Sequence, residues 1–526
     1  MTVTGSPDII INELDLSTYV SSASTTIGAI VGDFQWGPID FPVTISNEGK
    51  LVEKFATPNN INYKDWFVAK NYLAYSSNLR TVRTCSSTAV NACDVVAEAT
   101  LIKNETTFEA QYSSLTATGK TAKIFAKYAG DFGNKIRVVI KGSTTAAEES
   151  SPLKAYITKV LSTTDVAFGV FIEGTLQEFG IYSLNKNSQD ISGYSNYLFT
   201  TVNKSSSYVY LLKERILTVD EEGTPNNIDI DVTLKGGVSG DVAVSNYKTS
   251  WDLFKSSDIE EVSLLMQGGA SPEIGTYIID IASSRKDCVA CTSPLMTDCV
   301  NNIDPVSAIK TTCEPYPMSS YRFVDGNYKY QYDSYNDVYR WVPLNGDSAG
   351  LMARTDEEEH PWNSPAGKSI VDCIKFAFYP DKTDRDELWK YNINPYTAFK
   401  EEGHVLWGDW TGVNNTAFNF VGVRRGFLYM EKQIAAFARK VMWKQNDEIT
   451  QTEFIQAVEP FLRNVQGGRG ISEFKVFADS TVNTSDIIDQ GLFISKIAVK
   501  PIRSVRWVQI TFIATRSDVD INEIVQ

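Results

Sequence analysis

The chain has 526 residues, 43% of them hydrophobic and 21% charged, which is typical of a folded protein with about three or four domains. The formal net charge of −15 argues against a nucleic-acid or anionic-membrane partner, because both require clustered Lys and Arg. There is no signal-peptide pattern and no apolar run of about 18 residues, so we expect neither export nor a membrane span. The seven scattered cysteines favour free thiols in a reducing compartment.

The first elements predict an α/β unit that follows a short arm. Residues 1–23 hold too few apolar side chains for a core of their own, so we interpret them as an arm that docks elsewhere. Residues 25–32 predict a buried strand, and residues 79–84 predict a second one. Apolar residues with helical spacing at 63–75 lie between these strands, which gives the strand–helix–strand order of an α/β domain.

The pattern changes between residues 96 and 235. Short β-prone runs alternate there with polar turns, and this spacing predicts an inserted β-rich domain. The α/β pattern returns afterwards, with helices expected at 247–254 and 272–284. We therefore predict a discontinuous α/β middle domain, residues 24–95 and 236–364, that an all-β outer domain interrupts.

The last part of the chain predicts a C-terminal inner α+β domain over residues 365–515. Apolar residues spaced 3 and 4 apart indicate an amphipathic helix at 423–441, and a second helix is expected at 452–465. Residues 516–526 are interpreted as a second arm. Strands are expected at residues 470–478, 492–499 and 505–514. The whole chain is thus predicted to be a multidomain α+β protein with extended arms at both ends.

The sequence offers little to catalysis. A hydrolytic device would have to use one of two histidines, His360 or His404, and both lie in polar segments without a nucleophile-elbow motif. The Cys-x-x-Cys pair Cys288 and Cys291 has no second pair to complete a zinc site, and we interpret both as buried cysteines of a strand. We predict no catalytic residue, no metal and no cofactor.

Two segments suggest interaction surfaces. Residues 321–341 hold eight aromatic side chains among Asp and Asn residues, which would suit sugar stacking or calcium binding, but we favour packing at a domain seam or a subunit contact. The helix at 423–441 concentrates positive charge. We weigh two interpretations of this charge equally, a contact with a partner and a face exposed to solvent. An α/β enzyme with hydrolase-like activity and a carbohydrate-binding surface protein remain the alternatives from other functional classes.

One long tract resembles a known family. Residues 341–356 read WVPLNGDSAGLMARTD and residues 362–367 read WNSPAG, which is similar to the signature of contractile tail sheath proteins of T-even-like and cyanobacterial myophages. Shorter matches follow in the same order as in that family, at residues 29–38, 128–134 and 501–504. The opening residues 6–9 match less well, because Asp8 stands where the family usually has Gly.

The resemblance implies a non-enzymatic virion protein that polymerises with itself. Stacked hexameric rings would surround a tail tube, contract on a baseplate signal and drive the tube through the host envelope. The implied partners are further copies of the chain, the tail tube, the baseplate and the tail terminator, with no nucleic acid and no membrane. Assembly would take place in the host cytoplasm.

The resemblance also suggests two sets of contact residues. Terminal arms are expected to add strands to neighbouring subunits, and the C-terminal domain is expected to lie against the tube. Candidate arm contacts between subunits are Ile9, Ile10, Ile11, Trp507, Gln509, Thr511 and Ile513. Candidate tube-facing residues are Arg424, Arg425, Lys432, Arg439 and Lys440.

Overall fold

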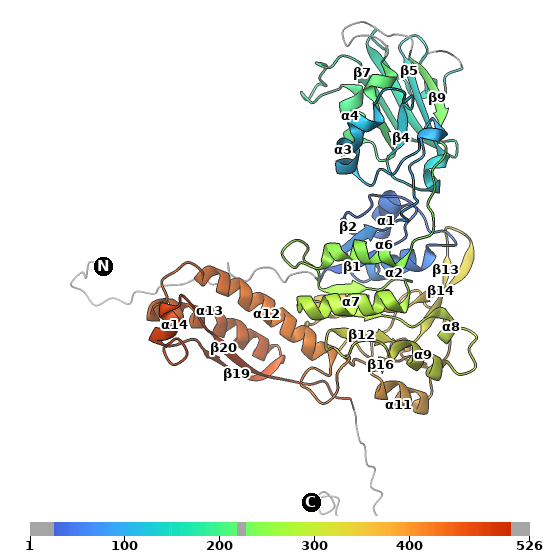
Figure 1. Cartoon of the computed structure of the whole chain (residues 1–526). Helices are drawn as coiled ribbons and strands as arrows, with labels where there is room; N and C mark the ends of the chain where they lie inside the picture. Colours follow the sequence, from blue (N-terminus) through green and yellow to red (C-terminus); the bar gives the residue numbers. More distant parts are fainter. Residues whose placement is uncertain (1–25, 147, 149, 159, 218–227, 507–526) are drawn as a thin grey trace, which may run out of the picture. The chain divides into compact units, whose positions relative to one another are not determined.

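The computed structural model describes residues 26–146, 148, 150–158, 160–217 and 228–506 of the chain. These residues form two compact units (Figure 1). The first unit comprises residues 26–359 and 365–421, and the second comprises residues 360–364 and 422–506.

A seven-stranded, mainly parallel sheet forms the centre of the first unit. The strand order is β16-β12-β11-β10-β1-β3-β2, in which the edge strand β2 runs antiparallel to β3 and the other pairs are parallel. The chain therefore first adds β2 and β3 on one side of β1, and later adds β10, β11, β12 and β16 on the other side. The strands are β1 (Gly28–Gly32), β2 (Val43–Ile45), β3 (Leu79–Arg83), β10 (Leu264–Met266), β11 (Val289–Thr292), β12 (Arg322–Asp325) and β16 (Ile393–Asn394).

Helices pack against this sheet and leave β1 wholly buried. Consecutive residues of a strand point to opposite faces, so the complete burial of Ala29 and Ile30 shows that both faces are covered. A Cβ on Gly28 would lie 2.6 Å from the ring of Tyr72, which explains the glycine at this position. The helices are α1 (Glu48–Phe55), α2 (Tyr63–Leu73), α6 (Val244–Trp251), α7 (Pro272–Arg285), α8 (Met296–Cys299), α9 (Pro305–Cys313), α10 (Asn345–Glu358) and α11 (Lys382–Lys390).

The segment between β3 and β10 forms two antiparallel sheets of its own, with orders β4-β8 and β7-β6-β5-β9. It is not all-β as predicted, because α3 (Glu105–Leu115), α4 (Leu198–Ser205) and α5 (Lys213–Ile216) lie within it. Asn104 caps α3 by accepting a hydrogen bond from the Thr107 amide. The strands are β4 (Ile124–Ala126), β5 (Ile136–Gly142), β6 (Asp165–Ile172), β7 (Thr175–Ser183), β8 (Val209–Leu211) and β9 (Asp229–Thr233).

Two smaller antiparallel sheets complete the first unit. One has the order β14-β13-β15, and the other pairs β17 with β18. Their strands are β13 (Tyr328–Asp333), β14 (Val338–Pro343), β15 (Lys375–Phe376), β17 (Tyr396–Phe399) and β18 (Gly403–Leu406).

The second unit packs a helical hairpin on a two-stranded sheet. Its long helices α12 (Val421–Val441) and α13 (Glu448–Gly467) confirm both predicted helices, and α13 continues through Pro460. β19 (Ile471–Phe477) pairs antiparallel with β20 (Lys496–Pro501), and α14 (Ser485–Asp489) lies between them in sequence. The strand predicted at 492–499 begins only at residue 496, and residues 507–514 of the last predicted strand lie outside the described residues.

The core of the second unit forms where the apolar face of the hairpin meets the sheet. Phe454, Val458 and Leu462 recur at helical spacing along α13 and are buried together with Met430 of α12 and Ile471 of β19. Among the described residues, none of the helices combines the length and hydrophobicity that a transmembrane span requires.

Candidate functional site

The amino terminus of α10 occupies the edge of the sheet where parallel α/β proteins usually bind ligands. Asn345, the first residue of α10, is fully buried. Its Nδ2 donates to the Gly268 carbonyl and to Ser293 Oγ, both at 2.9 Å, and its Oδ1 accepts from the Gly268 amide at 3.1 Å. Because Gly268 follows β10 and Ser293 follows β11, one side chain joins the carboxyl ends of two strands.

The same network extends to the end of β12. Ser293 Oγ donates to Asp325 Oδ2 at 2.6 Å, and Asp325 is fully buried. Burial raises the pKa of Asp325 well above its ordinary value, while the hydrogen bond from Ser293 opposes this shift. A second residue of α10, Ser348, shares a 2.8 Å hydrogen bond with the Tyr396 hydroxyl.

A buried ion pair links α10 to β13. Lys329 Nζ donates to Asp347 Oδ1 at 2.8 Å, and both side chains are completely buried. Tyr75 donates to the same oxygen at 3.0 Å, and Lys329 also donates to the Val371 carbonyl at 2.9 Å. Burial raises the pKa of Asp347, and the ammonium group of Lys329 opposes this.

These contacts explain what the NGDSAG part of the sequence motif does. The side chains of Asn345, Asp347 and Ser348 are bound by the chain itself, at the edge where an enzyme of this architecture would bind a substrate. The motif therefore fixes α10 on the sheet. Sequence reasoning recognised this motif through the family resemblance but did not identify these partners, which come from five separate segments.

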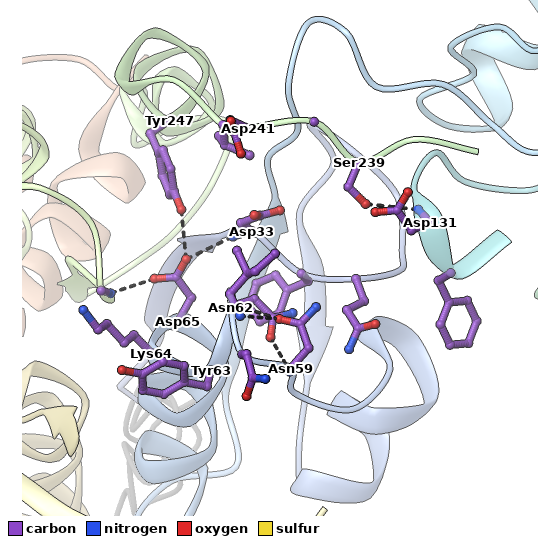
Figure 2. Close-up of a pocket in the computed structure, with 18 residues that line it drawn as sticks. Asp33, Asn59, Asn62, Tyr63, Lys64, Asp65, Asp131, Ser239, Asp241 and Tyr247 are labelled. Atoms are coloured by element: carbon purple, nitrogen blue, oxygen red, sulfur yellow. Dashed lines mark hydrogen bonds between the residues drawn. The ribbon is translucent and has the colours of Figure 1, made fainter. Parts of the chain in front are cut away.

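A cavity of about 560 Å³ lies beside this network, beyond the carboxyl end of β1 (Figure 2). Asp65 of α2 organises one wall of it. Its carboxylate accepts hydrogen bonds from the Asp33 amide at 3.0 Å, the Gly269 amide at 2.7 Å and the Tyr247 hydroxyl at 3.0 Å. Burial raises the pKa of Asp65, and these three hydrogen bonds oppose the shift. The sequence analysis did not find this cavity.

The two histidines pack against aromatic rings. In the second unit His360 stacks on Trp362 with ring centroids 4.5 Å apart. In the first unit His404 meets the edge of Phe376 at 4.9 Å, and burial lowers its pKa. Both contacts are of the kind that holds a structural histidine.

The Cys-x-x-Cys pair is buried, as the sequence analysis predicted. Cys291 lies in β11 and Cys288 precedes that strand. Burial raises the pKa of Cys288 far above its ordinary value, which makes the thiol unreactive. Within the described parts of the chain, no group of three or more His, Cys, Asp or Glu side chains could hold a metal ion.

The aromatic segment forms a sheet whose polarity is reversed. Lys329, Gln331 and Asp333 of β13 point inward and are buried, whereas Tyr332 on the alternate face is exposed. On the other face, rings pack across the two strands: the ring centroids of Tyr330 and Trp341 are 4.7 Å apart, and those of Tyr332 and Tyr339 are 5.1 Å apart. Asp333 pairs with Arg340 at 2.6 Å, so this carboxylate serves the sheet itself.

The predicted contact residues fall into three groups. Lys432, Arg439 and Lys440 are exposed on the second half of α12. Arg424 and Arg425, in its first half, are buried. The candidate arm contacts Ile9, Ile10, Ile11, Trp507, Gln509, Thr511 and Ile513 all lie outside the described residues.

Together, the internally hydrogen-bonded sheet edge, the packed histidines and the buried, unreactive cysteines define a multidomain α+β protein whose polar groups support structure. Comparison with known proteins identifies the family. Models of the phage tail sheath central domain and C-terminal domain match residues 245–411 and 413–515, just over half of the chain. The chain therefore belongs to the phage tail sheath family, which confirms the resemblance seen in the sequence, and it is a structural protein rather than an enzyme.

Relatives match from end to end. Tail sheath proteins of Vibrio phage KVP40 and Enterobacteria phage T4 are 27% and 24% identical to the chain, in each case over 99% of both sequences. The sheath tail protein Lin1278 of Listeria innocua has a similar fold, with a TM-score of 0.58 at 11% identity over 93% of this chain and 94% of that one. The sheath of an extracellular contractile injection system, solved in the contracted state, gives a TM-score of 0.51 at 14% identity over 99% of this chain and 100% of that one.

Proposed function

We propose that the chain is the subunit of a contractile tail sheath. Copies of it polymerise as stacked hexameric rings around a tail tube, and the sleeve contracts to drive the tube through the host envelope. The observation that carries this proposal is the end-to-end match to phage tail sheath proteins. Assembly would take place in the host cytoplasm, with the baseplate and the tail terminator at the two ends of the sleeve.

In this proposal the domains have different positions in the sleeve. Residues 24–95 and 236–364 form the middle domain, residues 96–235 lie on the outside, and residues 365–515 lie against the tube. Arms at residues 1–23 and 516–526 connect neighbouring subunits. The second compact unit supports only part of this arrangement, a separate body formed by residues 360–364 and 422–506, because sliding subunits need bodies that can move as wholes. Residues 365–421 belong to the first unit instead.

The tube contact is proposed to involve the exposed basic residues of α12. Lys432, Arg439 and Lys440 project from a part of the chain without net charge, since residues 365–526 contain 20 basic and 20 acidic side chains. The rest of the chain carries the whole net charge of −15. A local basic patch of this kind attracts an acidic partner, and the attraction weakens as salt screens it.

Co-assembly with the tube protein tests this contact. The variant Lys432→Glu/Arg439→Glu should lose sheath–tube complexes at low salt, as counted by negative-stain electron microscopy. The control Lys120→Glu/Lys123→Glu changes the same number of charges at exposed positions of the inserted segment and should assemble like the wild type. Equal numbers of complexes from both variants would exclude α12 as the tube contact.

The inter-subunit sheet is proposed to form on β19 and β20. A sheet of only two described strands leaves hydrogen-bonding edges to which an arm can add. Each added backbone hydrogen bond contributes about 0.5–1.5 kcal/mol, and the contributions add up over many subunits. Deleting residues 1–15 should therefore leave folded monomers that do not polymerise. Sleeves of normal length from this deletion would rule out a connecting role for the N-terminal arm.

A further inference from the structure

The cavity beyond β1 lies at the point where the sheet changes its direction of growth. From β1 the chain adds β3 on one side, and it later adds β10, β11 and β12 on the other. In parallel sheets the carboxyl ends of two such strands diverge at this point and leave room for a ligand. Asp33, directly after β1, and Gly269, after β10, both line the cavity.

The cavity carries an excess of negative charge. It is lined by four carboxyl groups and one ammonium group, from Asp33, Asp65, Asp131, Asp241 and Lys64 (Figure 2). The pKa of Asp33 is raised to about 6, mainly by burial and to a lesser extent by the carboxylates of Asp65 and Asp241, while the guanidinium group of Arg83 opposes the shift. The carboxylates of the cavity thus repel one another, and a cation placed between them would relieve this repulsion.

The other lining groups fit an organic cation. Phe34, Tyr63, Phe132 and Tyr247 contribute aromatic rings, which attract ammonium and guanidinium groups through their π faces. Asn62 also lines the cavity and is 3% exposed. Its Oδ1 accepts from the Asn59 amide at 2.8 Å, whereas its Nδ2 has no hydrogen-bond partner among the described residues. A buried donor of this kind requires an acceptor atom from outside, because an unsatisfied polar group is costly.

A metal ion fits the same residues less well. Among the described residues, the carboxyl groups of the cavity do not converge into a set of three potential metal ligands. An extended organic cation can contact carboxylates that are spread around a cavity of about 560 Å³, which is within the usual size range of ligand sites.

We propose that this cavity binds an alkylammonium or guanidinium group, supplied either by a free polyamine or by a Lys or Arg side chain of a second copy of the chain. Asp33 and Asp241 neutralise the cation, the aromatic rings flank it, and Asn62 donates to an acceptor atom next to it. A bound cation would also connect segments far apart in the sequence. Asp131 of the inserted segment lines the cavity together with Asp33 and Asp241, and its backbone amide donates a hydrogen bond to Ser239 Oγ in the cavity wall. Only the second source rests on the proposed polymerisation.

Calorimetric titration of the unpolymerised chain with spermidine tests the site itself. The wild type should bind one equivalent saturably, and Asp33→Asn and Asp241→Asn should each weaken the affinity at least about tenfold, since each removes one neutralising charge. Asp258→Asn, at an exposed position away from the cavity, is the matched control and should bind like the wild type. Spermidine is protonated at neutral pH and has no acceptor atom, so Asn62→Ala should bind it like the wild type; the acceptor for Asn62 would be a peptide carbonyl next to a Lys or Arg of a second copy.

The pH dependence gives a second measurement on the same samples. Wild-type affinity for spermidine should fall as the pH drops from 7 to 5, because the carboxyl group of Asp33 takes up a proton near pH 6. In Asp33→Asn this part of the pH dependence should vanish. The proposal is overturned if Asp33→Asn and Asp258→Asn bind spermidine equally. It is also overturned if sodium chloride, added to the same ionic strength as the spermidine solution, abolishes all binding, as it would for a diffuse surface charge.

Crosslinking distinguishes the two sources of the cation. In assembled sleeves, a carbodiimide should join Asp241 to a Lys of a neighbouring chain if a subunit supplies the cation, and spermidine should then inhibit polymerisation. Spermidine binding with no crosslink and no inhibition would assign the site to a free polyamine. Failure of spermidine to bind while the sleeves form normally would overturn the cation site and leave the sheath function intact.

Discussion

Replacing Lys329 by Met should destabilise the first unit more than a change at an exposed ion pair would. The substitution keeps the length of the side chain but leaves the carboxylate of Asp347 completely buried without a counter-charge. The Tyr75 hydroxyl, 3.0 Å from Asp347 Oδ1, would still donate a hydrogen bond to this carboxylate but would not neutralise its charge. Breaking one side of a buried ion pair costs about 3–5 kcal/mol, whereas an exposed pair contributes on the order of 0–1 kcal/mol.

Hydrogen exchange of the α10 amides measures this effect locally, which avoids assuming that a multidomain chain unfolds in one step. A loss of about 3–5 kcal/mol corresponds to exchange that is roughly 10²- to 4 × 10³-fold faster. The control Lys50→Met removes a partner of Glu53 at an exposed pair and should leave exchange nearly unchanged. Equal exchange in both variants would refute the idea that the buried pair holds α10 in place.

The sign of the pH effect adds a second check. Burial already raises the pKa of Asp347 above 3.8, and removing the ammonium group of Lys329 raises it further. A carboxyl group with a raised pKa in the folded state favours folding at low pH and disfavours it as the pH rises through its native pKa. The destabilisation of Lys329→Met should therefore be largest at a pH at which the carboxyl group of Asp347 is ionised and should decrease as the pH falls and the group takes up a proton. A penalty independent of pH would mean that lost packing, rather than an unpaired charge, is its cause.

Three further substitutions test other parts of the structure. The pKa of Asp33 rises from 3.8 to about 6 on folding, so Asp33→Asn should raise the free energy of unfolding at pH 8 by up to about 3 kcal/mol and have no effect below about pH 4 in thermal denaturation. Gly346→Ala would place a Cβ 2.5 Å from the Val68 carbonyl and should cost about 1–3 kcal/mol, whereas Gly467→Ala, with open space around it, should be neutral or stabilising in urea titrations. Asn104→Ala removes the cap of α3 and should cost about 1 kcal/mol, measured as faster exchange in its first turn.

Local patterns in the sequence were sufficient for the regular elements with strong periodicity. The apolar spacing at 423–441 predicted α12 because one face of that helix is buried and the other is exposed. The continuous apolar run within residues 25–32 predicted β1, because both faces of this strand are covered and every residue of it is buried. α3 was missed, because its segment lies among β-prone runs and its helix depends on the Asn104 cap and on the buried contacts of Phe108 and Leu115.

The polar centre could not be predicted from local patterns. Lys329 sits in a run of alternating tyrosines, and alternation alone would place the tyrosines inward and the lysine outward. The structure instead buries Lys329 and exposes Tyr332, although Tyr328 stays in the core, because Asp347, eighteen residues later, supplies a buried partner for Lys329. The cavity was missed for a similar reason, since Asp33, Asp65 and Asp241 become neighbours only when β1, α2 and α6 pack together.

The reversed polarity of β13 connects the fold to the function of the family. Its charged and polar residues are used to fix α10 on the sheet, so its tyrosines have to face outward. Ion pairs and hydrogen bonds in a buried network have one good geometry, whereas apolar contacts can slide. This network holds α10 in a single position on the sheet, and on the other face of β13 and β14 the rings of Tyr332 and Tyr339 remain exposed.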